Sequence, residues 1–178
     1  MRPALLTLLC GLIVVPAALA MPHATGDGVL ELTAVTGTVQ IGSIAQPAKG
    51  ALWGQMDKGT LRAVDPTGPS DGTVLVSSRD LKRTPFVTAD GTKGVLYSGD
   101  DLHFRVTGGK YKLLFKGSGI DLTAIGVGVA TLTGDSSAVD PGSYAVDNGD
   151  WQDVPVGAAA PAVVAFPATA PTTTTSSP

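Results

Sequence analysis

Between residues 27 and 154 the apolar positions come in short runs and do not follow the spacing of a helix. Runs of four to eight residues rich in Val, Thr and Leu alternate with Gly, Asp and Asn. No long window repeats its apolar positions every 3.6 residues, which indicates strands joined by tight turns. We therefore expect one all-β domain over residues 27–154, built from antiparallel hairpins as a sandwich or as a solenoid-like stack of hairpins.

The clearest predicted hairpin lies around Gly108-Gly109, between the runs 101–107 and 110–116. A two-residue Gly-Gly turn suits the hairpin turns that need positive φ, and its length fixes the register. The predicted apolar pairs on one face are Val106 with Tyr111, Phe104 with Leu113, and Leu102 with Phe115. The other face would place Arg105 opposite Lys112.

A second hairpin is predicted at residues 144–153, where Asn148-Gly149 joins two short runs. Asn-Gly is the strongest short-range hairpin signal, and a two-residue turn here would place Val146 opposite Trp151.

A weak internal repeat relates residues 31–41 to residues 121–132, with a looser copy at 61–76. Each copy reads as strand, glycine-centred turn, strand. Two interpretations stay open: a duplicated β unit, or unrelated hairpins of similar composition.

The two ends of the chain differ from this pattern. Residues 1–20 combine Arg2, an apolar run and the small-x-small sequence Ala18-Leu19-Ala20, which predicts a secretory signal cleaved between Ala20 and Met21. A retained membrane anchor and lipidation at Cys10 are the alternatives. We expect a short flexible segment at 21–26 and a disordered Ala/Pro/Thr-rich tail at 155–178. These features predict a secreted or envelope-associated protein that contacts the membrane only if the signal is retained.

Composition narrows the function classes. Cleavage would remove Cys10, the only cysteine, and with it any disulfide or thiol chemistry. Loss of Arg2 would leave 11 Lys and Arg against 15 acidic residues, a net charge of −4. That charge argues against a nucleic-acid partner. Fourteen of the acidic residues are Asp and only Glu31 is Glu, which favours turns over helix interiors.

Motifs for catalysis and cofactors are weak. The sequence Gly68-Pro-Ser70-Asp-Gly72 fits the pattern of a serine-hydrolase nucleophile, but prolines precede it and a strand-like run follows, where a helix is required. The run 147–150 could attract calcium, but hairpin geometry alone explains it, and the ligands that an EF-hand loop needs are absent. We expect no catalytic residue, no cofactor and no metal.

The candidate binding residues are basic. His103, Arg105, Lys110 and Lys112 would share the polar face of the first predicted hairpin. They could contact an anionic envelope polymer, an acidic lipid headgroup or an acidic protein, and such a shallow charged patch would bind weakly and lose affinity as salt rises. The alternative is a solvated face whose lysines keep the sheet from aggregating.

Three stretches carry a family resemblance: 104–113, with Thr-Gly-Gly-Lys-Tyr at its centre, 117–126, which begins Gly-Ser-Gly-Ile, and 142–151, with Tyr-Ala-Val-Asp-Asn-Gly-Asp-Trp at its end. Over roughly Leu102 to Pro155 the chain resembles a group of uncharacterised small secreted β-rich proteins of actinobacteria. The resemblance implies a shared β fold and export, and it implies no catalytic residues.

From these observations we expect a non-enzymatic exported protein whose β surface interacts weakly with an anionic polymer, a lipid or a protein. Two other functions stay open. One is an extracellular hydrolase of wall polysaccharide that uses Asp residues, which needs two carboxyl groups in one cleft. The other is a lipid carrier, which needs an enclosed apolar cavity.

Overall fold

The computed structural model describes residues 26–43, 45–64, 73–157 and 160–167. Its strands are β1 (Gly28–Ile41), β2 (Ala48–Val64), β3 (Val74–Ser77), β4 (Lys82–Val87), β5 (Lys93–Gly134), β6 (Ser143–Val146), β7 (Gln152–Asp153) and β8 (Ala162–Phe166). The described residues contain no helix, and the predicted all-β class is confirmed. The predicted signal segment lies outside the described residues.

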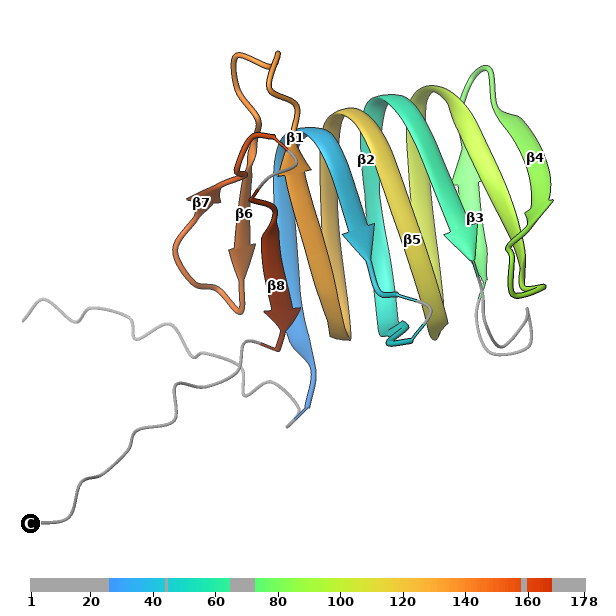
Figure 1. Cartoon of the computed structure of the whole chain (residues 1–178), viewed down its shortest axis with the longest axis horizontal. Helices are drawn as coiled ribbons and strands as arrows, with labels where there is room; N and C mark the ends of the chain where they lie inside the picture. The colour runs from blue at the N-terminus through green and yellow to red at the C-terminus, as the bar shows by residue number, and fades with distance from the viewer. Residues whose placement is uncertain (1–25, 44, 65–72, 158–159, 168–178) are drawn as a thin grey trace, which may run out of the picture.

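The long strands pair in antiparallel fashion, because partner numbers fall as residue numbers rise along β1 and β2. Strand β2 lies between two passes of β5: Thr60 pairs with Ser98 on one side and with Lys116 on the other, 18 residues further along. Strand β5 therefore makes one turn of a coil in about 18 residues, and β1 and β2 wind in the opposite direction between its turns. Figure 1 shows the resulting ribbons arching side by side over one edge of the molecule.

Each turn of the coil contributes one segment to each of two layers. The first layer contains β3, 102–107 of β5, 50–56 of β2, 119–126 of β5, 28–33 of β1, β6 and β7. The second layer contains β4, 94–98 of β5, 60–64 of β2, 112–117 of β5, 37–41 of β1, 128–134 of β5 and β8. The Phe104 and Phe115 rings meet between the layers with centroids 4.7 Å apart.

The inward-facing side of a strand changes at the corner between the layers. In β5 the buried Tyr97 has an odd number, whereas the buried Leu102 and Phe104 have even numbers. Successive strand residues point to opposite faces, so one extra residue at the corner is needed to keep apolar side chains inside both layers. That corner holds Asp101 at φ 54°, and the matching corner of β1 holds Ala34 at φ 53°.

Glycine pairs let neighbouring strands approach closely at the corners. Gly59 faces Gly117, Gly37 faces Gly134, and Gly50 faces Gly126. A Cβ atom on five of these six glycines would lie inside contact distance of backbone atoms on the facing strand, whereas at Gly134 it would meet Pro141 and Val156 instead. Side chains are therefore excluded at these glycine positions of the corners.

Gly117→Ala tests this steric requirement. The new Cβ would meet the Gly59 Cα at 2.9 Å and press on the Lys58 carbonyl, so we expect a loss of unfolding free energy of more than about 2 kcal/mol. The control is Gly91→Ala, which has φ +83° but nothing within 4 Å and should cost about 1–2 kcal/mol from backbone strain alone. Urea denaturation measures both, and equal costs would contradict the steric explanation.

The core between the layers contains one polar atom without a partner. Tyr111 is 2% exposed. Among the side chains that the structure describes, its hydroxyl oxygen is the buried polar atom without a hydrogen-bond partner. Burial raises the pKa of Tyr111 to about 12. An unsatisfied buried hydroxyl costs folding free energy that a phenyl ring does not.

Tyr111→Phe should therefore raise the free energy of unfolding at pH 7 by about 1 kcal/mol. Between pH 10 and about 12 the unfolded chain ionises this hydroxyl while the folded chain keeps it protonated. The wild type should therefore lose on the order of 3 kcal/mol over that range through this group. The variant should lack that part of the alkaline loss, as urea titrations at pH 7 and pH 11.5 would measure. Parallel alkaline losses in the two proteins would contradict the assignment.

The prediction of a hairpin around Gly108-Gly109 is wrong. Both glycines have positive φ, at 83° and 82°, but the chain turns a corner there and continues as β5. Val106 pairs with Leu52 and Val74, and Tyr111 pairs with Ala48. The six apolar residues of the predicted pairs do lie on one side of the chain, since all six are buried in the core: Leu102, Phe104, Val106, Tyr111, Leu113 and Phe115.

The hairpin predicted near residue 148 forms with its turn placed one residue earlier. Asp147 and Asn148 have φ of 51° and 58°, and the Gly149 N–H donates to the Val146 carbonyl at 2.8 Å. The pair with positive φ is therefore Asp147-Asn148, and Tyr144 pairs with Gln152, which shifts the predicted register by one residue.

The prediction that a disordered tail begins at residue 155 is wrong for residues 162–166. Residues 162–166 form β8, which pairs with 128–132 of β5, and Phe166 is 1% exposed within the core. Pro161 and Pro167 flank this strand, so no proline interrupts its pairing. The domain extends to residue 167, and the remaining tail lies outside the described residues.

A chain ended after Pro167 should keep the stability of the full chain, whereas a chain ended after Val154 should lose β8 and Phe166. Removing a buried Phe side chain alone costs about 3–5 kcal/mol, so we expect the shorter chain to unfold at a temperature lower by 10 °C or more, about 4 °C for each kcal/mol lost in a domain of this size. Phe166→Ala in the full chain separates the core contribution from the strand pairing. Thermal melts followed by circular dichroism measure all four proteins, and equal midpoints for the two shortened chains would contradict the role of β8.

An open groove on the outer face of the first layer

A groove of about 640 Å³ runs over the outer face of the first layer. Its lining comes from β1, β2 and two passes of β5, together with residue 151 next to β7. The coil brings these segments together, although they are distant in the sequence.

Both tryptophans of the chain lie in this groove. Trp53 lies on β2 and is 43% exposed, and Trp151 follows the β6–β7 turn and is 53% exposed. Large exposed aromatic side chains leave apolar surface in water, which a binding partner can cover.

Polar side chains cross the strands beside Trp53. One line of paired residues crosses four neighbouring strand segments. Glu31 of β1 pairs with Thr123 of β5. On the next strand Trp53 of β2 pairs with Thr123 on one side and with Arg105 of β5 on the other. These four residues are all part of the groove lining. Adjacent strands lie about 4.8 Å apart, so this line extends about 14 Å across the sheet.

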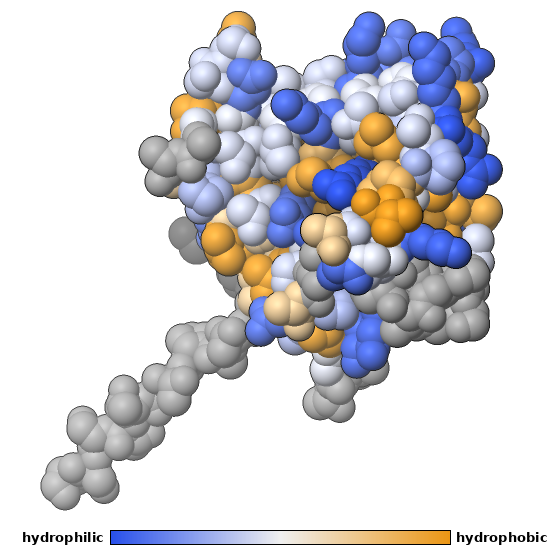
Figure 2. Space-filling model, turned by 45° about the vertical axis from the view of Figure 1, so that its right-hand side comes forward, coloured by the Kyte–Doolittle hydropathy of each residue, from blue (hydrophilic) through white to orange (hydrophobic). Residues whose placement is uncertain are grey.

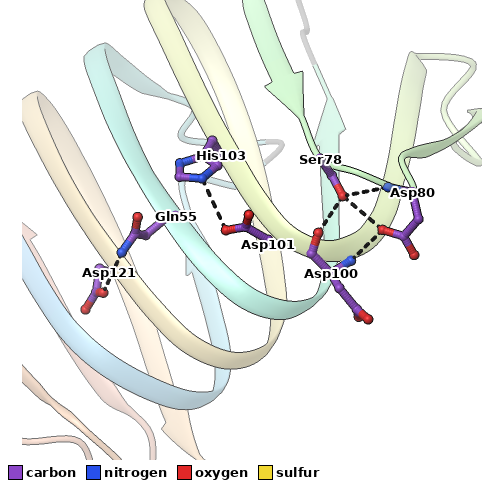
Figure 3. Close-up of polar contacts among 7 residues, drawn as sticks. All are labelled: Gln55, Ser78, Asp80, Asp100, Asp101, His103 and Asp121. Atoms are coloured by element: carbon purple, nitrogen blue, oxygen red, sulfur yellow. Dashed lines mark hydrogen bonds and ion pairs between the residues drawn. The ribbon is translucent and has the colours of Figure 1, made fainter.

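A second line of polar residues is held at the corner of the layer. The Asp121 carboxylate accepts a hydrogen bond from the Ala34 N–H at 2.7 Å and one from the Gln55 side-chain amide at 3.4 Å. Next to Gln55, the His103 ring nitrogen Nε2 lies 3.2 Å from Asp101 Oδ1. Figure 3 shows the contact between Gln55 and Asp121 and the contact between His103 and Asp101. Contacts within the protein thus hold the side chains of Asp121, Gln55 and His103 in place.

The β6–β7 hairpin that carries Trp151 is fastened to β1 at its turn. The Val29 N–H donates to Asp147 Oδ1 at 2.7 Å, and the Asp147 N–H donates to the Val29 carbonyl at 2.9 Å. Within the hairpin, the Tyr144 hydroxyl donates to Gln152 Oε1 at 2.7 Å. These contacts set the position of the groove wall that contains Trp151.

The four basic residues predicted to share one face are divided between the layers. His103 and Arg105 lie in the groove. Lys110 pairs with Lys49 at the next corner, and Lys112 pairs with Val64 in the second layer. Arg105 therefore does not face Lys112, because the hairpin that would have joined them does not form.

Sequence analysis missed the aromatic, acidic and amide side chains of the groove: Glu31, Trp53, Gln55, Asp121 and Trp151. The available signal was weak: Trp53 shares a strand face with Gln55, two residues further along, and Trp151 lies between Asp150 and Gln152. Their meeting depends on strand pairing that no local pattern specifies.

Many other aspartates hold turns. A backbone hydrogen bond from Asp100 lowers the pKa of Asp80, a side-chain hydrogen bond from Thr88 lowers the pKa of Asp90, and a backbone hydrogen bond from Ser137 lowers the pKa of Asp135. Figure 3 shows Asp80 and Ser78 joining the β3–β4 connection to Asp100 at the corner of β5. These carboxylates serve the fold, as their turn positions predicted.

The described residues hold no cluster of three or more His, Cys, Asp or Glu side chains that could bind a metal ion. Ser70 of the hydrolase-like motif lies outside the described residues. Among the described residues we find no helix with the length and apolar character needed to cross a membrane.

Comparisons of the chain with protein-family models, with curated proteins and with solved structures give no significant match.

Proposed function

We propose that this is an exported, non-catalytic protein that binds a polysaccharide in the groove of the first layer. The observation that carries the proposal is the convergence of Trp53 and Trp151, 98 residues apart in the sequence, on one open groove lined by hydrogen-bonding side chains. The predicted signal and the resemblance to exported proteins support a location outside the cytoplasm.

Indole rings and polar side chains together match the chemistry of a sugar. A pyranose ring has an apolar face of C–H groups that can stack on an aromatic side chain, and a rim of hydroxyls that donate and accept hydrogen bonds. Trp53 offers the aromatic surface, while Glu31 can accept and Arg105 can donate hydrogen bonds on either side of it. The open groove leaves room for a chain to extend beyond the contacted rings.

The charge of the groove favours an uncharged polymer. Glu31 and Asp121 carry two negative charges, and Arg105 carries one positive charge, with His103 beside Asp101. The chain as a whole carries a net charge of −3. A polyanion would meet carboxylates in the groove, which favours an uncharged polymer over an anionic one.

Polysaccharide hydrolysis is the second candidate, because Glu31 and Asp121 line the same groove. Thr123 is the partner of Glu31, and Asp121 lies two residues before Thr123 on that strand. Such diagonal neighbours have Cα atoms about 7–8 Å apart, a spacing from which two side chains can bring their carboxyl groups to the separation of about 5–9.5 Å that glycosidases use. Asp121, however, already accepts hydrogen bonds from Ala34 and Gln55, which gives it a structural role at the corner.

A lipid carrier would need a lumen between the layers. The described core instead holds packed side chains in that space, among them Phe104, Phe115, Leu113 and Leu122. We therefore place the ligand outside the layers.

Trp53→Ala and Trp151→Ala should each weaken binding by at least tenfold, or about 1.4 kcal/mol. Isothermal titration against soluble neutral glucans and mannans, with teichoic acid as the anionic comparison, measures the affinity. Val87→Ala is the control, because Val87 is an exposed apolar residue on β4 that lies outside the groove.

Reducing-end release from the same polymers separates the two candidate functions. Binding of a polymer without release of reducing ends supports the proposed binding function. Release of reducing ends that is abolished in Glu31→Gln would instead assign hydrolysis to the groove. Unchanged affinity in both tryptophan variants, or binding of teichoic acid alone, would refute the groove as a site for neutral polysaccharide.

A further inference from the structure

The second layer ends in an edge strand without charged residues. Strand β8 has the sequence Ala-Val-Val-Ala-Phe and pairs with β5 on one side. No other described strand pairs with β8. An edge strand presents backbone N–H and C=O groups that can pair with another chain unless charge, proline or a bulge protects them.

The opposite edge of the same layer is protected. Strand β4 begins with Lys82 and Arg83 and has Pro85 in its middle. Proline lacks the N–H that pairing needs, and the charged side chains oppose the approach of a second sheet. Figure 1 shows β4 and β8 at opposite ends of the molecule. The two edges of one layer therefore differ in their capacity to pair.

The surface around β8 is also apolar. Val163 of β8 is 68% exposed, Val156 is 54% exposed and Val127 of β5 is 47% exposed. The segments 127–134 and 154–167 contain no charged residue. By contrast, the side of the molecule that Figure 2 brings forward carries small hydrophobic clusters interspersed with hydrophilic residues.

We propose that β8 pairs in antiparallel fashion with β8 of a second copy of the chain, so that the second layers of two copies form one continuous sheet. The strand is self-complementary in this arrangement. With Val164 opposite Val164 of the copy, the exposed Val163 lies opposite the small Ala165, and Ala162 lies opposite Phe166. Inward-facing residues then stay on the core side in both copies, as a two-fold axis perpendicular to the sheet requires.

A second copy fits this edge better than a charged partner does. Neither β8 nor the neighbouring pass of β5 offers a charged side chain to pair with a polar segment. Two identical apolar edges instead place each exposed Val163 beside Ala165 of the other copy and satisfy backbone groups on both strands. This inference goes beyond polysaccharide binding and does not depend on it, because no β8 residue lines the groove.

Sedimentation velocity of the purified protein over a range of micromolar concentrations tests the proposal. The wild type should sediment with twice the mass of the chain, and Val163→Lys should sediment as a monomer. The matched control is Val87→Lys on β4, an edge residue that is 64% exposed, which should remain a dimer. Thermal melts verify folding, and Ala165→Lys replaces Val163→Lys if the latter does not fold.

A cysteine pair tests the register. In a chain with Cys10→Ser, the combination Val163→Cys and Ala165→Cys should give a covalent dimer on oxidation, because directly opposed Cβ atoms lie about 4.5–5.5 Å apart. A wild type that is monomeric at every concentration overturns the proposal. A dimer that persists in the folded lysine variant of β8, or a dimer that is lost in Val87→Lys, places the interface elsewhere and also overturns the proposal.

Discussion

Close approach of backbones at paired glycines is the constraint on which this fold depends. Where Gly59 meets Gly117 and Gly50 meets Gly126, the facing strands come too near each other for any side chain. These contacts let β2 and β5 bend together from one layer to the other while their pairing continues. Without such corners a 17-residue strand such as β2 would extend about 56 Å as a flat ribbon, at about 3.3 Å per residue, and could not fold over its own core.

The same corners create the groove. Since neighbouring strands bend at matching positions, their outward-facing residues stay aligned across the sheet, and Glu31, Trp53 and Arg105 form one line from three different parts of the chain. The left-handed conformation of Ala34 directs its N–H to Asp121, which ties the corner of β1 to the floor of the groove. The fold and the proposed binding surface thus depend on the same local backbone geometry.

The sequence predicted which side of each strand faces the core but not which strands pair. Alternation of apolar residues assigns Phe104 and Leu113 to the interior whatever their neighbours are. Positive φ at Gly108 and Gly109 is also compatible with a hairpin and with a corner, so the turn signal could not distinguish them. Val106 pairs instead with Leu52 and Val74, 54 and 32 residues away, and no local pattern indicates such distant pairings. For that reason two groove residues, His103 and Arg105, were found from the sequence, while Trp53 and Trp151 were not.

The proposed dimer gives the groove a geometry suited to a polymer. A two-fold axis perpendicular to the joined second layers keeps both first layers on the same side of the assembly, so the two grooves open in the same direction. A long polysaccharide, or a surface made of many chains, could then occupy both grooves at once. The second contact would be intramolecular, and binding through two weak sites can exceed the affinity of either by a factor of about 10² to 10⁴ when both are reached together. On the proposed function, a shallow, open groove with two aromatic side chains would bind one polymer segment weakly, and the proposed pairing of two copies through an uncharged edge strand would add the avidity of a second groove.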